Sequence, residues 1–267
     1  MNESKLHRCA VITGASAGLG TEFARQLASC VETLVLVARR EGRLEELADE
    51  LRREHAGLKV GVIVADLTKS EDRSRVVSKI SDAGLLPDLL INNAGMGDYG
   101  EFSEARWPKL ESMIRLNIEA LTHLSHAMLP AMKQGGGGSI INVSSLACLL
   151  PIPDFAVYAA TKSYVTSFSE ALRLELREHG IGVTALCPGP VHTEFGSVAK
   201  ENGGDSEFPG REFFYTDKEV VVAEALAAMR ADRARVFPGW QVAVAAVIIA
   251  ALPIGLIRLA MGTRPRR

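Results

Sequence analysis

The strongest constraint on the fold is an alternation of short apolar runs with longer amphipathic stretches, which begins at residue 8. Runs such as Leu34–Val37 and Val60–Val64 are apolar without a clean period of two, as expected for strands covered on both faces. Strand and helix signals that alternate along a chain are typical of βαβ units on a parallel sheet. The sequence therefore predicts an α/β fold, with a parallel seven-stranded sheet and helices on both of its faces.

The expected elements can be placed along the chain. Strands are expected at residues 8–13, 33–38, 59–64, 88–91, 138–144, 181–187 and 234–237. The helices expected between them cover residues 18–29, 41–56, 70–83, 104–133, 154–179 and 217–231. No linker rich in proline, glycine or serine divides the chain, so we expect one domain over residues 1–239, followed by a tail over residues 240–267.

Composition and charge exclude several classes of protein. Of the 267 residues, 47% are hydrophobic and 23% charged, which is typical of a folded chain rather than an extensively disordered one. The formal net charge of -2 carries no signature of nucleic-acid binding. No acidic or cysteine cluster accompanies His123 and His126, so no metal site is expected.

The cysteines and the N-terminus bear on the compartment. The four cysteines are scattered without a CxxC pair, which favours reduced thiols. The residues before the first expected strand include no apolar stretch of signal-peptide length. A cytoplasmic protein is therefore the expectation.

Three glycines suggest a phosphate-binding turn. Gly14, Gly18 and Gly20 follow the apolar run Ala10–Ile12 and open the first expected helix. Backbone N–H groups and the helix N-terminus can face a pyrophosphate at such a turn. The spacing differs from the common GxGxxG pattern, but strand, turn and helix follow in the order of a dinucleotide site.

The end of the second expected strand bears on which dinucleotide is bound. Folds that prefer the unphosphorylated cofactor place an acid there, to bind the ribose 2′-hydroxyl. This chain has Arg39 and Arg40 instead, and a guanidinium fork suits a phosphate. NADP is therefore the predicted cofactor, with Arg39 as the first candidate and Arg40 as the second. Two consecutive arginines can also form a solvated helix entrance.

Two later strand ends offer further contacts to a dinucleotide. Asp66 and Leu67 follow the third expected strand and can reach the adenine, although Asp66 could instead cap the next helix. Asn93, Ala94 and Gly95 close the fourth expected strand. A turn of small residues would lie there against the adenosine ribose.

Tyr158 and Lys162 indicate proton chemistry. They lie four residues apart in an expected helix, so both side chains share one face. A phenol titrates at about pH 10 in water, and a nearby ammonium favours its anion. Two further polar residues, Ser145 and Asn117, precede this pair in the sequence. Each residue taken singly has a structural explanation: Tyr158 could be a dimer contact, Ser145 could end a strand, and Asn117 could form a hydrogen bond within its helix.

In order and spacing, these motifs resemble the short-chain dehydrogenase/reductase family. The resemblance covers about residues 8–237 and includes Thr13–Gly20, Asn92–Gly95, Asn117, Ser145, Tyr158–Lys162 and Pro188–Gly189. It implies a single-domain, doubly wound Rossmann fold. It also implies a homodimer or homotetramer, because the expected helices 104–133 and 154–179 resemble the family's dimer-forming pair.

The resemblance further implies roles for individual positions. The catalytic set would be Asn117, Ser145, Tyr158 and Lys162, while Val191 and Thr193 would face the nicotinamide carboxamide. Ala17 departs from the basic residue that many NADP-dependent members carry, which leaves the phosphate prediction with Arg39. Together with the residues above, the expected cofactor-binding set is Gly14, Ser16, Gly18, Leu19, Gly20, Arg39, Arg40, Asp66, Leu67, Asn93, Ala94, Gly95, Tyr158, Lys162, Pro188, Gly189, Val191 and Thr193.

The expected function is NADP(H)-dependent interconversion of a ketone or aldehyde and the corresponding alcohol, on an apolar small molecule. Hydride would come from the nicotinamide and the proton from Tyr158. One alternative is reduction of a 3-oxoacyl thioester. An alternative of another class is a nucleotide-binding regulatory or scaffold protein.

Two segments interrupt the alternation. Residues 194–215 mix aromatic side chains with glycines and charges, which fits either a substrate lid or a surface loop. Residues 242–257 are sixteen consecutive uncharged residues, followed by Arg258, and fall short of the ~20 needed to span a bilayer. We expect the tail to pack over the substrate mouth or a partner subunit. Contact of residues 241–262 with the inner membrane surface is the alternative.

Overall fold

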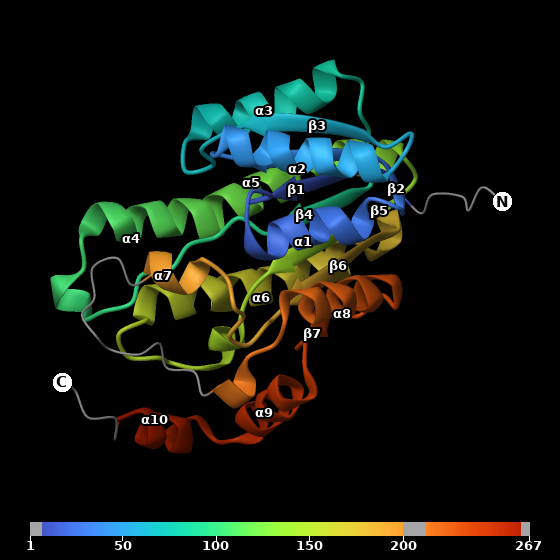
Figure 1. Cartoon of the computed structure of the whole chain (residues 1–267). Helices are drawn as coiled ribbons and strands as arrows, with labels where there is room; N and C mark the ends of the chain where they lie inside the picture. Colours follow the sequence, from blue (N-terminus) through green and yellow to red (C-terminus); the bar gives the residue numbers. More distant parts are fainter. Residues whose placement is uncertain (1–6, 200–211, 263–267) are drawn as a thin grey trace.

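The computed structural model describes residues 7–199 and 212–262, and a parallel sheet runs through its centre (Figure 1). The strands are β1 (His7–Thr13), β2 (Val31–Ala38), β3 (Lys59–Val64), β4 (Leu89–Asn92), β5 (Gly138–Val143), β6 (Ile181–Leu186) and β7 (Arg235–Val236). Their order is β3-β2-β1-β4-β5-β6-β7, and every neighbouring pair is parallel. The predicted fold class is confirmed. The direction of winding changes between β1 and β4, which is where open α/β sheets bind ligands.

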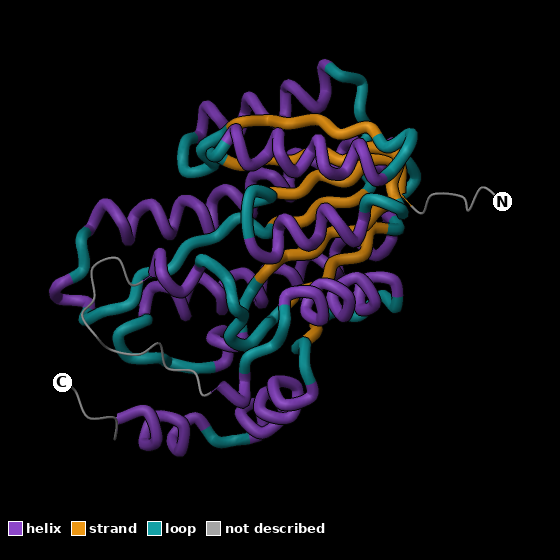
Figure 2. Tube along the Cα trace, in the orientation of Figure 1, coloured by secondary structure: helices purple, strands orange, loops and turns teal. Residues whose placement is uncertain are grey.

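Helices cover both faces of this sheet (Figures 1 and 2). Successive side chains of a strand point to opposite faces, so Ala10 and Ile12 of β1 enter one apolar cluster and Cys9 and Val11 the other. The first cluster joins the sheet to α1 (Gly18–Leu27), α2 (Glu41–Glu54) and α8 (Lys218–Arg230). The second joins it to α3 (Ser70–Asp82), α5 (Leu121–Gln134) and α6 (Ala156–Leu176).

The long helix expected at residues 104–133 is divided into parts. A short 3₁₀ turn, η1 (Phe102–Glu104), precedes α4 (Trp107–Ile114), and the π-helical segment η2 (Arg115–Ala120) then leads into α5. Asn117 lies in η2, where its side chain makes hydrogen bonds outside the helix. A π turn inserts a residue into the helical register, and such turns are frequent at functional sites.

The remaining elements lie near the carboxyl ends of the strands or in the tail, except η4, which directly precedes the amino end of β6. They are η3 (Leu146–Leu149), η4 (Arg177–His179), α7 (Phe195–Ala199), η5 (Glu212–Phe214), α9 (Trp240–Ala251) and α10 (Ile254–Gly262). Within the described ranges, no single helix is long and apolar enough to cross a membrane. Helices α9 and α10 reach that length and apolar character only as a pair, and they meet at an angle of 113°.

Candidate active site

The four predicted catalytic residues lie together at the carboxyl ends of β4 and β5. Ser145 follows β5 in an extended conformation and begins η3, while Tyr158 and Lys162 lie one turn apart on α6. The Ser145 and Tyr158 hydroxyls are hydrogen-bonded, and the Lys162 Nζ lies 5.6 Å from the centroid of the Tyr158 ring. Asn117 reaches the same helix through Thr161, whose Oγ1 accepts from the Asn117 Nδ2 at 3.0 Å.

Burial dominates the titration of Tyr158. Only 6% of the residue is exposed. Removal from water disfavours the phenolate and raises the pKa of Tyr158 to about 12, against the opposing effect of the Ser145 hydrogen bond. The phenol is therefore protonated throughout the neutral range. It is equipped to give a proton to a bound oxygen atom.

Lys162 is buried as well, and its environment acts in the opposite direction. Its Nζ donates to the carbonyl oxygen of Val143, at the end of β5, over 2.8 Å. Desolvation disfavours the ammonium and lowers the pKa of Lys162 to about 8. Lys162 thus carries a positive charge at neutral pH and begins to lose it slightly above.

Asn117 ties the end of β4 to the catalytic helix. Its Oδ1 accepts from the backbone N–H of Met96 at 3.0 Å, and its Nδ2 donates to the Met96 carbonyl oxygen at 2.9 Å. A Cβ added to Gly95 would lie 3.3 Å from the Asn117 Oδ1 and 3.5 Å from the Lys162 Nζ. The backbone at Gly95 therefore closes one side of the group formed by Asn117 and Lys162.

The glycine turn is shaped for an anionic ligand. Gly14 and Gly18 adopt φ values of 66° and 56°, which favour glycine, and a Cβ at Gly20 would run into the carbonyl oxygen of Gly14. The Nδ2 of Asn93 donates to the Thr13 carbonyl oxygen at 3.0 Å, which holds the turn against the end of β4. Ala17 precedes α1 and supplies no side-chain cap for its first turn. These features fit the pyrophosphate of a dinucleotide.

Of the two candidate arginines, Arg40 lies against the glycine turn. Its guanidinium donates to the Ser16 Oγ at 3.2 Å and to the Ser16 carbonyl oxygen at 3.3 Å. It also pairs with Glu194 at 2.8 Å, and Glu194 pairs in turn with Arg43 at 2.6 Å. Arg39 is exposed and has no hydrogen bond or ion pair with the described residues. The sequence favoured Arg39 over Arg40 as the phosphate ligand, whereas in the structure it is Arg40 that contacts the glycine turn.

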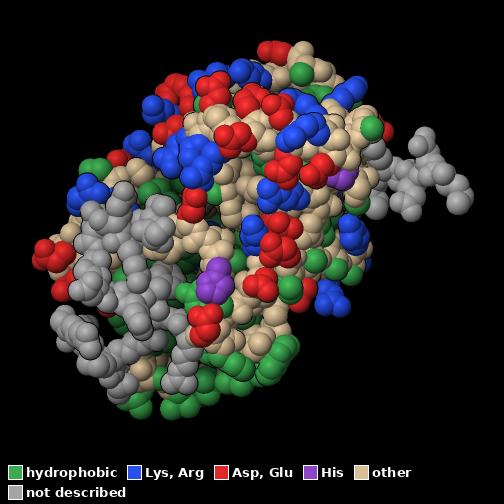
Figure 3. All heavy atoms as spheres, in the orientation of Figure 1, with side chains coloured by type: hydrophobic (Ala, Val, Ile, Leu, Met, Phe, Trp, Pro, Cys, Tyr) green, Lys and Arg blue, Asp and Glu red, His purple; other side chains and the backbone are tan. Residues whose placement is uncertain are grey.

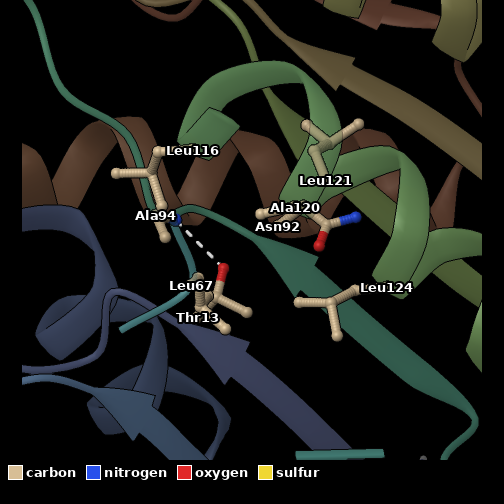
Figure 4. Close-up of a pocket in the computed structure, with 8 residues that line it drawn as sticks. All are labelled: Thr13, Leu67, Asn92, Ala94, Leu116, Ala120, Leu121 and Leu124. Carbon is tan, nitrogen blue, oxygen red and sulfur yellow. Dashed lines mark hydrogen bonds between the residues drawn. The ribbon is translucent and has the colours of Figure 1, made fainter. Parts of the chain in front are cut away.

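Asp66 and Leu67 follow β3 as predicted, and their side chains have partners within the chain. The Asp66 carboxylate accepts from the N–H and the hydroxyl of Thr68, and it does not cap α3, which begins after Lys69. Leu67 is buried. Its side chain helps to line a narrow apolar pocket under the site (Figure 4), whose other residues are Thr13, Asn92, Ala94, Leu116, Ala120, Leu121 and Leu124.

The segment after β6 crosses the same end of the sheet. The Pro188 carbonyl oxygen accepts from Leu146 N–H at 2.8 Å, which joins this segment to η3. A Cβ on Gly189 would lie 2.7 Å from the Val242 Cγ2, and one on Gly18 would lie 3.2 Å from the Thr193 Cγ2. Val191 packs on the core cluster of α1, as does Leu19. The segment thus passes between the glycine turn and the tail.

Aromatic side chains surround Tyr158, and sequence reasoning did not identify most of them. Phe155 stacks on the Tyr158 ring at a centroid distance of 4.2 Å, Phe195 lies 5.5 Å from it, and Tyr99 meets Phe155 edge-on at 5.8 Å. The only available signal was that Phe155 precedes Tyr158 by nearly one helical turn. Phe195 belongs to the segment considered as a lid. Phe208 of that segment lies outside the described residues.

No group of three or more metal-ligating side chains occurs in residues 7–199 and 212–262. His192 lies 3.3 Å from the carboxylate of Glu212 and stacks on Tyr215 at a centroid distance of 4.2 Å. The site therefore consists of Tyr158, Ser145, Lys162 and their supports, beside the glycine turn.

Known proteins match this chain over most of its length. Residues 8–203 match the family model described as short chain dehydrogenase. Sulfoacetaldehyde reductase 2 of Chromohalobacter salexigens is 35% identical over 222 residues, which cover 81% of this chain and 84% of that protein.

Solved structures agree with this match. A short-chain dehydrogenase from Sphingobium yanoikuyae in complex with NADPH has a TM-score of 0.80 at 33% identity, with 97% of both chains covered. The bulky-bulky ketone specific alcohol dehydrogenase from Comamonas testosteroni has a TM-score of 0.76 at 31% identity, with 97% of this chain and 95% of that chain covered. The chain belongs to the short-chain dehydrogenase/reductase family of oxidoreductases.

Proposed function

We propose that this protein is an NADP(H)-dependent oxidoreductase that interconverts an apolar ketone or aldehyde and its alcohol. The observation that carries the proposal is the buried, protonated Tyr158, hydrogen-bonded to Ser145 with the Lys162 ammonium 5.6 Å from its ring. A nucleotide-binding module or scaffold has no need of such a proton donor. Family membership supports oxidoreductase chemistry on carbonyl and alcohol groups.

In the reductive direction, Tyr158 donates its proton to the carbonyl oxygen and Ser145 donates a hydrogen bond to the same atom. The nicotinamide, when bound, supplies the hydride. Lys162 stabilises the phenolate that remains, because an ammonium beside the ring favours the anion. Asn117 positions Lys162 indirectly, by holding the Met96 backbone and Thr161 on either side of it.

The preference for NADP is supported by the end of β2. Arg39 and Arg40 follow Ala38, and no carboxylate follows β2 where a 2′-hydroxyl acceptor would be needed. Arg40 lies against Ser16 of the glycine turn, where a bound phosphate would compete with Glu194 for its guanidinium. The NADPH of the Sphingobium yanoikuyae relative agrees with this preference.

An apolar substrate is supported by the surroundings of Tyr158. Phe155, Phe195 and Tyr99 present aromatic surface beside the reacting hydroxyl. Such surface favours apolar groups on either side of a carbonyl. The Comamonas testosteroni relative is described as specific for bulky-bulky ketones, which also favours an apolar substrate.

We further propose a homodimer or homotetramer, as the family resemblance implies, and a cytoplasmic location. The four cysteines are free thiols in the structure, which suits a reducing compartment. Peripheral contact of residues 241–262 with the inner membrane surface belongs to the same proposal.

A turnover panel tests the proposed function. The purified protein is mixed with saturating NADPH or NADH and with small aldehydes, bulky ketones and a 3-oxoacyl thioester, and loss of nicotinamide absorbance is followed. We expect turnover of bulky ketones with a clear preference for NADPH. Preferential turnover of the thioester would favour the second enzymatic candidate. Tight NADPH binding without turnover of any compound would favour a nucleotide-binding regulatory protein.

A further inference from the structure

The helix pair α9–α10 exposes an unusually continuous apolar surface. Its three most exposed large side chains are Trp240 (68%), Val247 (71%) and Leu259 (67%). They are accompanied by Val244, Ile248, Leu252, Ile254 and Leu256, all more than 40% exposed. Figure 3 shows hydrophobic side chains gathered along the lower edge of the molecule, where Figure 1 places α9 and α10. From residue 240 to residue 262 the chain has one charged residue, Arg258, so a single charge interrupts this surface.

The geometry of the pair fits a position in the surface of a bilayer rather than across it. Helix α9 has 12 residues and α10 has 9, so at ~1.5 Å per residue each is about half the length of a spanning helix. The two meet at 113°, close to the break at Pro253. Two short apolar helices joined at such an angle can both lie with one side in the acyl boundary of a single leaflet.

Charge selects anionic lipid as the occupant of this surface. After Asp232 the sequence contains no Asp or Glu. Arg258 belongs to α10, and three more arginines follow that helix in the sequence, at positions 264, 266 and 267. Arginines next to an inserted apolar helix are attracted to anionic headgroups. A second copy of the chain would carry the same positive charges and so offers no complementary negative charge for them. The exposed Trp240 at the start of α9 also suits the headgroup region, where tryptophan is enriched.

The surface is joined directly to the edge of the active site. Val242 of α9 packs on Gly189, so closely that a Cβ there would lie 2.7 Å from its Cγ2. Trp240 meets Phe213 of η5 edge-on at a centroid distance of 5.8 Å. The segment that carries Gly189 is the same one that reaches the glycine turn through Thr193. A leaflet that holds α9 would therefore lie next to the segment that borders the candidate site.

We infer that α9–α10 is a docking surface for anionic bilayers, and that it lets the enzyme take an apolar carbonyl substrate from the membrane. The docking stands on the exposed apolar surface and the charge alone. The delivery of substrate rests on the proposed function, because it requires an apolar carbonyl compound to be the substrate.

Vesicle sedimentation with the full-length protein tests the docking. Vesicles of phosphatidylglycerol and phosphatidylcholine are compared with vesicles of phosphatidylcholine alone. We expect strong binding to the anionic vesicles, weaker binding to the neutral ones, release by high salt, and a shift of tryptophan emission to shorter wavelength as Trp240 leaves water. The double variant Val247→Glu/Leu259→Glu should lower the bound fraction about tenfold or more, since two charges would have to enter the apolar layer.

A matched control separates this effect from a general effect of added charge. Val220→Glu changes an exposed valine, 42% accessible, on α8 and should leave vesicle binding unchanged. Both variants alter exposed positions, so native thermal unfolding is expected for each. Equal loss of binding in Val220→Glu and the double variant would overturn the docking surface. A second result would also overturn it: the full-length protein does not bind anionic vesicles, and the double variant dissociates an oligomer that the full-length protein forms. That result would assign the surface to contact with a second copy of the chain.

Turnover then separates substrate delivery from the proposed function. With a bulky ketone dissolved in anionic vesicles, the full-length enzyme should be faster than the double variant, while both reduce a water-soluble ketone equally. Equal rates on the vesicle-dissolved ketone would overturn delivery from the membrane. Vesicle binding without reduction of any carbonyl compound would support docking and contradict the proposed function instead.

Discussion

In the proposed mechanism Tyr158 is the proton donor, because several neighbours act on its hydroxyl. Burial holds the proton on the phenol and raises the pKa of Tyr158 to about 12, while Ser145 binds the same hydroxyl. Lys162 offsets part of the cost of forming the phenolate, but only while it is charged. Because burial also lowers the pKa of Lys162 to about 8, both groups keep their protons below about pH 8, and Lys162 is the first to lose its proton as the pH rises.

These two pKa values predict the pH dependence of reduction. Below the Lys162 pKa of about 8, both Tyr158 and Lys162 are protonated, so kcat/KM for a ketone should be level from about pH 6 upwards. Above that value Lys162 loses the charge that stabilises the phenolate, and the rate should fall. A pH profile checks this, with Lys162→Met as the control that lacks the inflection. A wild-type rate that rises through pH 8 to about pH 9 would contradict the assignment.

Arg40 and Arg39 can be separated by cofactor kinetics. Because Arg40 lies on the glycine turn, Arg40→Ala should raise the KM for NADPH about 10- to 100-fold, the worth of hydrogen bonds to a charged group. The KM for NADH should hardly change, because NADH lacks the phosphate. Arg39→Ala should have the smaller effect. If Arg39→Ala gives the larger increase in KM for NADPH, Arg39 is the main phosphate ligand, as the sequence predicted. Equal kcat/KM of the wild type with NADPH and NADH would show that neither arginine selects NADPH.

At the level of elements, apolar periodicity predicted the strands well, because covered strands are short, apolar and bounded by turn residues. All seven expected strands occur within two residues of the predicted limits. Residues 104–133 show why some elements cannot be predicted in this way. The π turn at Asn117 depends on hydrogen bonds to Met96, a residue distant in sequence, and no local propensity reports such a bond.

The glycine turn gives a prediction at the same scale. A Cβ at Gly20 would strike the Gly14 carbonyl oxygen, so Gly20→Ala should destabilise the protein by ~1–3 kcal/mol and weaken NADPH binding. Gly42→Ala is the matched control, since Gly42 lies in the first turn of α2 with no atom within 4 Å of an added Cβ. That control should be neutral, or stabilising by up to ~1 kcal/mol. Urea unfolding and NADPH titration measure both effects, and similar results for the two variants would show that the turn is not closely packed.

At the scale of the whole molecule, the fold and the position of the site were predictable together. A parallel sheet gathers the carboxyl ends of its strands at one edge, so motifs that follow β1, β4, β5 and β6 must meet. The aromatic surroundings of Tyr158 were not predictable in this way. Phe155, Phe195 and Tyr99 come from separate loops and helices, and only the folded chain shows which side chains pack on the phenol.

The tail is the other whole-molecule feature that sequence reasoning left open. An apolar stretch can be buried, paired or exposed, and composition alone does not distinguish these states. In the structure Val242, Ala246 and Ile257 are the buried residues of α9 and α10, and large apolar side chains around them face outward. This exposure is what favours a membrane surface over packing across the substrate mouth.

The role of Tyr158 as proton donor is tested most directly by comparing wild type with Tyr158→Phe on a ketone that the wild type reduces with NADPH. Phenylalanine keeps the ring that stacks on Phe155 and removes only the hydroxyl. We expect kcat to fall about 100- to 10,000-fold, the usual contribution of a general acid, while the Kd for NADPH stays within about twofold. A variant that retained wild-type kcat would show that Tyr158 is not the proton donor.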